Sequence, residues 1–166
     1  MSRAAPSPAE RGVRVRAITA GVALERLADR GTVERALLVL ARARSRFERE
    51  GYEVQTTRVT LPPLVAALDE GARGAALEAI RANDTLVAAS GAMCSLGPVL
   101  TADRPDRGLA AWSAELVRAT RSTSFSVVAA SPTGGVHAHG AAVAAAVMHA
   151  VAAAVPEGKG SFRFAA

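Results

Sequence analysis

The chain has 166 residues and a formal net charge of +5; 50% of the residues are hydrophobic, 21% are charged and 4% are aromatic. This apolar content excludes a disordered chain, and the length fits one ordinary domain or one piece of a larger domain. A single cysteine, Cys94, excludes a disulfide scaffold and a cysteine-rich zinc module.

The N-terminal residues predict a tail followed by a strand. Residues 1–12 are rich in proline, alanine, serine and arginine and contain no apolar core, so we expect a flexible tail and no export signal. Residues 13–22 (VRVRAITAGV) alternate apolar and charged positions, which is typical of a β-strand.

The apolar stretch 141–155 is too short for a membrane span. We therefore expect a cytoplasmic protein with an α/β domain over residues 13–166.

The first predicted helix carries an apolar stripe and a dense set of arginines. We expect Thr32 to cap its N-terminus and Gly51 to follow its C-terminus in the left-handed conformation. Apolar residues recur every three or four positions, at Val33, Ala36, Leu37, Leu40, Ala43 and Phe47. Between Arg26 and Arg49, seven arginines accompany three acidic residues. These arginines form either a solvated outer face or a surface for nucleic acid.

The middle of the chain predicts two further strands and two further helices. Residues 52–61 (YEVQTTRVTL) are rich in β-branched and aromatic residues and end at two prolines, as a strand would. Residues 64–81 predict a helix, residues 85–90 (TLVAAS) a short buried strand, and residues 91–105 a loop. The next helix has one apolar face, made by Leu109, Trp112, Leu116 and Ala119.

The last third of the chain repeats the strand and helix pattern. Residues 125–130 (FSVVAA) predict a buried strand, and residues 136–155 predict a helix in which valines recur every four residues. Residues 161–166 (SFRFAA) predict a fifth strand, with Phe162 and Phe164 on one face. Because helices separate all five predicted strands, we expect right-handed βαβ crossovers and a five-stranded parallel sheet.

Two loops supply the candidate ligand-binding residues, because sites in parallel sheets gather at the carboxyl ends of strands. Each loop follows a predicted strand, and the candidates are Ser90, Gly91, Ser131, Thr133, Gly134 and Gly135. In the second loop, glycine N–H groups and the N-terminus of the following helix would suit an anionic ligand group. Ordinary turn chemistry is the alternative interpretation of both loops.

The motifs indicate no catalytic residue, metal or cofactor. The chain lacks the GxSxG motif of serine hydrolases and the GxGxxG motif of dinucleotide-binding folds. His137 and His139 are two residues apart, which does not suit one metal ion on a helix, so no metal site is expected. Cys94 is either a reactive thiol or a buried small apolar residue. Whether the protein is an enzyme stays open.

Several segments, in the same order along the chain, resemble those of the domain of unknown function 711 family. Residues 15–22 (VRAITAGV) are similar to the family's opening strand. Residues 47–59 and 96–99 look like its second strand, with the preceding helix end, and its third loop. Residues 125–136 and 160–166 look like a later strand with its loop and the fifth strand. After Gly-Val, where the family usually has asparagine, this chain has His137.

The resemblance implies a barrel similar to that of pyruvate formate-lyase and other glycyl radical enzymes, with ten strands in two five-stranded parallel halves. This chain would supply one half, as a separate subunit or a truncated product. A small-molecule pocket would form only after a second copy or another chain covers its exposed sheet face, which we expect to be apolar. The glycyl radical segment has no counterpart here, so radical catalysis is not carried over. The alternative is a free-standing basic module that binds nucleic acid through the first helix.

Overall fold

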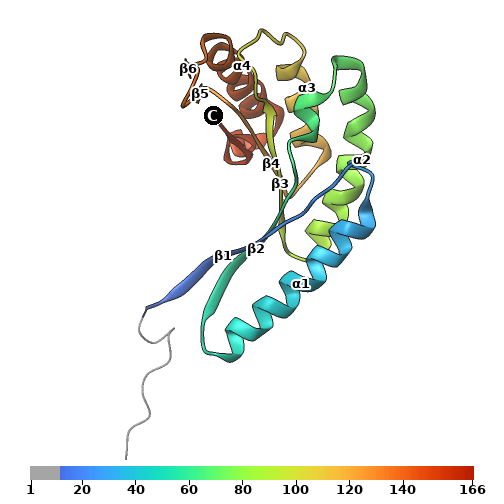
Figure 1. The fold of residues 1–166 in the computed structure, drawn as a ribbon, viewed down its shortest axis with the longest axis vertical. Helices are drawn as coiled ribbons and strands as arrows, with labels where there is room; N and C mark the ends of the chain where they lie inside the picture. Colours follow the sequence, from blue (N-terminus) through green and yellow to red (C-terminus); the bar gives the residue numbers. More distant parts are fainter. Residues whose placement is uncertain (1–11) are drawn as a thin grey trace, which may run out of the picture.

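The computed structural model describes residues 12–166, so the predicted tail lies, apart from its last residue, outside the described part. Five parallel strands form one sheet whose spatial order is the order of the chain, β1-β2-β3-β4-β7 (Figure 1). The strands are β1 (Arg14–Gly21), β2 (Glu53–Thr60), β3 (Met93–Leu100), β4 (Thr123–Val127) and β7 (Phe164–Ala165). The predicted α/β fold with a five-stranded parallel sheet is confirmed.

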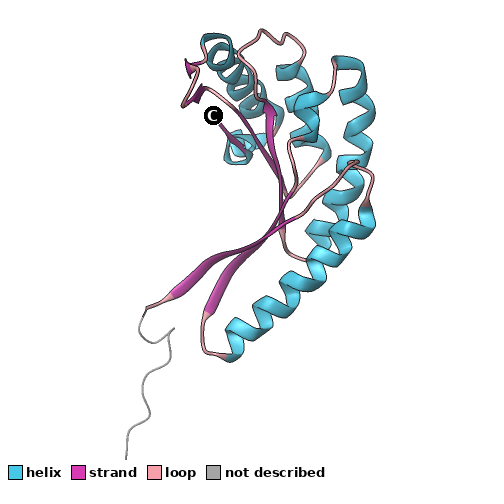
Figure 2. Ribbon diagram, in the orientation of Figure 1, coloured by secondary structure: helices cyan, strands magenta, loops and turns pink. Residues whose placement is uncertain are grey.

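The connecting helices form one layer beside the sheet. They are α1 (Arg30–Arg49), α2 (Glu70–Ala89), α3 (Leu109–Ala119) and α4 (Ala138–Ala154), with the short 3-10 helices η1 (Leu64–Ala67) and η2 (Pro156–Arg163). Successive crossovers of one hand place every helix on the same face when the strand order never reverses. Figure 2 shows α1, α2 and α3 along one side of the strands, and each α-helix contacts the next one in the chain.

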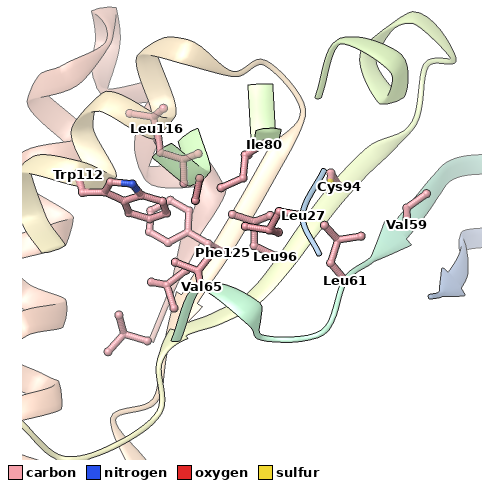
Figure 3. Close-up of a cluster of buried hydrophobic side chains, with 14 of the residues drawn as sticks. Leu27, Val59, Leu61, Val65, Ile80, Cys94, Leu96, Trp112, Leu116 and Phe125 are labelled. Atoms are coloured by element: carbon pink, nitrogen blue, oxygen red, sulfur yellow. The ribbon is translucent and has the colours of Figure 1, made fainter. Parts of the chain in front are cut away.

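The hydrophobic core fills the space between the sheet and this helix layer. Figure 3 shows side chains of β2, β3 and β4 meeting those of the helices and loops. Val59, Leu96 and Leu116 are at most 1% exposed, and full burial of such a side chain contributes about 1.5–3 kcal/mol to folding. The Trp112 and Phe125 rings pack edge to face with centroids 6.4 Å apart, which joins α3 to the central sheet.

The predicted strand at residues 85–90 is wrong, because this segment is the end of α2. Val87 continues the buried stripe of that helix after Ile80 and Asn83, and a short apolar run does not distinguish a buried strand from a buried helix. The third strand is instead β3, inside the segment predicted to be a loop. The predicted helix at residues 64–81 is η1 followed by α2, whose N-cap is Asp69.

Two local expectations at the first helix have different outcomes. The N-cap of α1 is Asp29 and not Thr32, because the Asp29 carboxylate accepts hydrogen bonds from the Thr32 N–H at 3.1 Å and the Thr32 hydroxyl at 2.7 Å. These hydrogen bonds, first that of the hydroxyl, lower the pKa of the Asp29 carboxyl. Gly51 follows the helix with φ 82°, as predicted for a left-handed C-terminal residue.

The last strand is shorter than predicted. Only Phe164 and Ala165 pair with β4, and residues 156–163 form η2. Phe162 therefore lies in η2 with 87% of its surface exposed. Phe164 packs against Phe125, with ring centroids 5.2 Å apart. The two phenylalanines do not share a strand face.

Candidate functional site

The sheet face that the helices do not cover is lined by small polar side chains and one arginine. Along β2, Thr57 and Val59 are buried on the helix side, whereas Thr56, Arg58 and Thr60 alternate with them and are partly exposed. We use the term open face for the partly exposed alternate residues of β2, β3 and β4: Thr56, Arg58, Thr60, Met93, Ser95, Ser124 and Ser126. The expectation of an apolar exposed sheet face is therefore wrong.

The strand register places hydroxyl groups of the open face side by side. Thr60 pairs with Ser95, and Ser95 pairs with Ser124, so three hydroxyl-bearing residues cross β2, β3 and β4 in one row. Arg58 pairs with Met93 in the adjacent row. Side chains at paired positions of parallel strands lie on the same face. A continuous polar surface therefore crosses the centre of the sheet.

A cavity of about 320 Å³ lies on this surface. Open-face residues of all three strands line it, together with Phe125 and residues 162–165. The Nε atom of Arg58 is buried and has no hydrogen-bond partner within the described part of the chain. No acidic side chain is among the described residues that line the cavity. The cavity is therefore positively charged.

Arg163, the second arginine beside the cavity, is held by the protein itself. Its guanidinium donates to the Thr120 carbonyl oxygen at 2.7 Å, to the Thr120 hydroxyl at 3.1 Å, and to the Val117 carbonyl oxygen. These groups lie at the C-terminal end of α3, where carbonyl oxygens lack helical partners and attract cations. Burial lowers the pKa of Arg163. Arg163 therefore fixes residues 162–165 against α3, which leaves Arg58 as the cation able to meet a ligand.

The loop after β4 forms a small hairpin in which a serine and a histidine meet. Its strands are β5 (Ala130–Ser131) and β6 (Gly135–Val136). Ser131 Oγ and His137 Nε2 lie 3.0 Å apart, and the Gly134 N–H donates to Ser131 Oγ at 3.0 Å. A Cβ atom at Gly134 would lie 2.8 Å from Ser131 Oγ and 3.1 Å from His137 Nε2, so a larger residue here would displace these two side chains. The Ser131 hydroxyl is therefore engaged by its neighbours, whereas His137 Nδ1 is buried without a partner among the described residues.

An aspartate caps the helix that follows this hairpin. Asp103, from the loop after β3, accepts hydrogen bonds from the N–H groups of His139 at 2.8 Å and Gly140 at 3.1 Å. These hydrogen bonds, first that of Gly140, lower the pKa of the Asp103 carboxyl. The N-terminus of α4 was expected to suit an anionic ligand group. In the structure a carboxylate of the protein occupies this position.

The six sequence-predicted ligand residues lie at two ends of the sheet. Ser90 is the C-cap of α2 and Gly91 follows it with φ +69°, so both precede β3 at the amino ends of the strands. Ser131, Thr133, Gly134 and Gly135 follow β4 at the carboxyl ends. The structure brings Ser131 and Gly134 together with His137 and leaves Thr133 and Gly135 exposed on the hairpin.

Sequence reasoning missed Arg58 and the serines of the open face. Their signal is a polar residue at every second position of a strand, as in Thr56, Arg58 and Thr60. Such alternation is typical of any half-buried strand. It became informative only when the register placed Ser95 and Ser124 beside this strand.

Of the two interpretations that the sequence left open for Cys94, the structure favours the buried small apolar residue. Cys94 is 1% exposed in the core, and burial raises the pKa of its thiol to about 12, so the reactive thiolate is not formed at neutral pH. Residues 12–166 contain no cluster of three or more histidine, cysteine, aspartate or glutamate side chains able to hold a metal ion. Within the same residues, no helix has the length and apolar character needed to cross a membrane.

The fold and site define an α/β protein whose parallel sheet has helices on one face and a polar, cationic cavity on the other. Comparison with protein families identifies the chain more closely. The family model described as Uncharacterised ACR (DUF711) matches residues 9–166. The chain belongs to this family, as the resemblance of its strand and loop segments predicted. No curated protein and no solved structure matches the chain.

Proposed function

We propose that this chain is one half of a two-part α/β barrel and that a small-molecule pocket forms when a second half covers its open face. The observation that supports this proposal is the parallel sheet with α1, α2 and α3 along one side and with polar strand residues exposed on the other side. Parallel sheets occur almost only with both faces covered. A second layer over the open face would restore that arrangement and would enclose the cavity of about 320 Å³.

The composition of the open face favours the wall of a ligand pocket over a dry protein–protein interface. Cores of stable protein interfaces are depleted in charged residues and rich in apolar side chains. The open face instead presents Arg58 and a row of hydroxyl groups. Polar groups that converge on a cavity are what small-molecule sites use to orient their ligands. The second half would then contact the rim of this face and leave its centre to the ligand.

The edge of the sheet offers a way for the second half to bind. β1 has eight residues and pairs only with β2 within the described part of the chain, so its outer backbone groups have no strand partner there. An unpaired edge of this length is a template for pairing with another chain. The second half comes from another copy of this chain or from a different chain.

Light scattering on a size-exclusion column tests this proposal with the full chain. We expect a discrete dimer that forms as the concentration rises from low to high micromolar. Ala17→Arg adds a long charged side chain to an exposed position of β1 that pairs with Thr56, and it should weaken this association. Ala111→Arg, at an exposed position of α3, is the matched control and should leave it unchanged. A stable, cooperatively folded monomer over the whole range would overturn the proposal, because the open face would then need no second layer from either source.

Nucleic-acid binding through α1 has less support, because several of its arginines are already engaged. Arg44 pairs with Glu48 at 2.9 Å and donates to the Val54 carbonyl oxygen at 3.0 Å. Arg35 donates to the Thr32 hydroxyl at 2.6 Å. Exposed arginines on an amphipathic helix are typical of a solvated outer face, and no observation favours the nucleic-acid alternative.

A further inference from the structure

We infer that the cavity on the open face binds a small organic anion, whose carboxylate or phosphate group pairs with Arg58. This inference deepens the proposed function, because it names the class of ligand for the same face. The cavity volume of about 320 Å³ falls at the lower end of the range for small-molecule sites. The ligand would therefore be a compact molecule.

The charge around Arg58 favours an anion. Arg58 forms no ion pair within the described part of the chain, and its Nε atom is buried without a partner. The residues paired with it across the sheet are Thr19 and Met93, and neither is acidic. Glu53, on the same strand, pairs with Arg14 at 3.0 Å. A buried guanidinium N–H without an acceptor is costly, and a bound carboxylate or phosphate would satisfy it.

Hydroxyl groups beside Arg58 have hydrogen-bonding capacity left for the other oxygen atoms of the anion. Ser95 Oγ accepts a weak hydrogen bond from the Gly97 N–H at 3.4 Å, so its O–H remains able to donate. The Ser126 hydroxyl makes no hydrogen bond to another described residue. Ser124 donates to the Cys94 carbonyl oxygen at 3.1 Å and keeps only its acceptor capacity. Two serine donors and one arginine thus face the same cavity.

An exposed aromatic ring indicates what the rest of the ligand contains. Phe162 lines the cavity from η2 and is 87% exposed. An aromatic side chain so exposed loses little by contacting a flat apolar group and gains burial from it. Arg163 fixes the adjacent backbone to the end of α3. The ring therefore has a rigid support, and we expect the ligand to carry a planar apolar part beside its acidic group.

Titration of the full chain with phenylphosphate, benzoate and inorganic phosphate, followed by calorimetry, tests the inference. We expect phenylphosphate or benzoate to bind more tightly than inorganic phosphate, with affinity that falls as salt concentration rises. Arg58→Gln should weaken binding at least tenfold and Arg58→Lys less, because lysine keeps the charge without the fork of donors. Arg118→Gln, at an exposed position of α3, is the matched control and should bind like the wild-type chain.

A second variant and a measurement of oligomeric state separate the possible outcomes of this titration. Phe162→Ala changes a surface residue, so it should fold normally and lose the preference for the aromatic anions while keeping the affinity for inorganic phosphate. Equal binding by Arg58→Gln and the wild-type chain, or no binding of any probe by the wild-type chain, would overturn the inference. Light scattering on the same samples separates the two proposals: a dimer that binds no anion refutes only this inference, and a monomer that binds through Arg58 refutes only the two-part barrel.

Discussion

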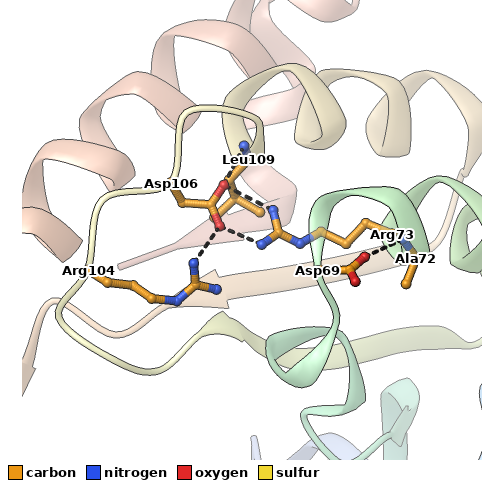
Figure 4. A network of polar contacts seen from close by, with 6 residues as sticks. All are labelled: Asp69, Ala72, Arg73, Arg104, Asp106 and Leu109. Carbon is orange, nitrogen blue, oxygen red and sulfur yellow. Dashed lines mark hydrogen bonds and ion pairs between the residues drawn. The ribbon is translucent and has the colours of Figure 1, made fainter.

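Replacement of Asp106 by alanine should destabilise the protein by about 3–5 kcal/mol, the usual cost of removing one partner of a buried ion pair. Asp106 precedes α3, and its carboxylate accepts from both Nη atoms of Arg73 on α2, at 3.1 and 2.5 Å (Figure 4). The two side chains are only 3% and 7% exposed. Asp106 also accepts from the Leu109 N–H at 3.0 Å. The substitution would therefore leave a buried guanidinium without its counter-ion and would remove the side-chain acceptor of the first N–H group of α3.

Urea unfolding at neutral pH measures this loss as a difference in the free energy of unfolding. Glu78→Ala is the matched control, because Glu78 also forms an ion pair with an arginine of α2 but does so on the surface. Its side chain is 77% exposed and lies 3.9 Å from that of Arg81. Such an exposed pair contributes at most about 1 kcal/mol. If Asp106→Ala costs no more than Glu78→Ala, the argument from burial is wrong.

The same carboxylate should make stability depend on acid. Hydrogen bonds from Arg73, followed by the charges of Arg73 and Arg104, hold the pKa of the Asp106 carboxyl below its ordinary value of 3.8. Since the unfolded chain takes up this proton first as pH falls, the contribution is complete above about pH 5 and is lost as pH falls through the folded pKa. Asp106→Asn should therefore lose less stability than the wild-type chain on acidification. If the free energy of unfolding falls equally steeply with acidification in the two proteins, this assignment is wrong.

One labelling reaction and three substitutions test the packing of the fold. The folded chain should protect Cys94 from iodoacetamide at mildly alkaline pH, because burial raises its pKa to about 12, and urea should expose it; rapid labelling of the native protein would contradict this. Gly160→Ala should lower the melting temperature, because its Cβ would lie 2.1 Å from a backbone oxygen of α4, whereas Gly74→Ala, with open space around it, should raise it. Asp84→Asn should cost about 1–3 kcal/mol in urea unfolding, because its buried carboxylate accepts from two backbone N–H groups and the Thr123 hydroxyl.

The parts of the fold that the sequence predicts well are those with a clear period. The strand at residues 13–22 and the helix at residues 136–155 agree with β1 and α4 to within two residues at each end. In α4, Val143, Val147 and Val151 recur every four residues and are all buried. A periodic stripe identifies both the element and its buried face, so tertiary contacts had little to add in these segments.

The central strand could not be predicted because its sequence contains loop-forming residues. β3 includes Gly97 with φ +68° and Pro98, and its register with β4 shifts on both sides of Pro98. A bulge tolerates glycine and proline inside a strand because the ladder is interrupted there. The neighbouring apolar run around Val87 continued α2 instead. Placing the third strand one segment too early also placed Ser90 and Gly91 at the wrong end of the sheet.

The consecutive strand order connects the fold to the position of the ligand. In doubly wound sheets the order reverses, helices cover both faces, and ligands bind at the crevice where the order changes. The five described strands show no such reversal, so their carboxyl ends provide no crevice of that kind. At those ends Ser131 and Asp103 already bind other groups of the protein. Arg58, whose Nε atom has no partner among the described residues, lies on the uncovered face beside the cavity, and this is where a ligand would find both charge and volume.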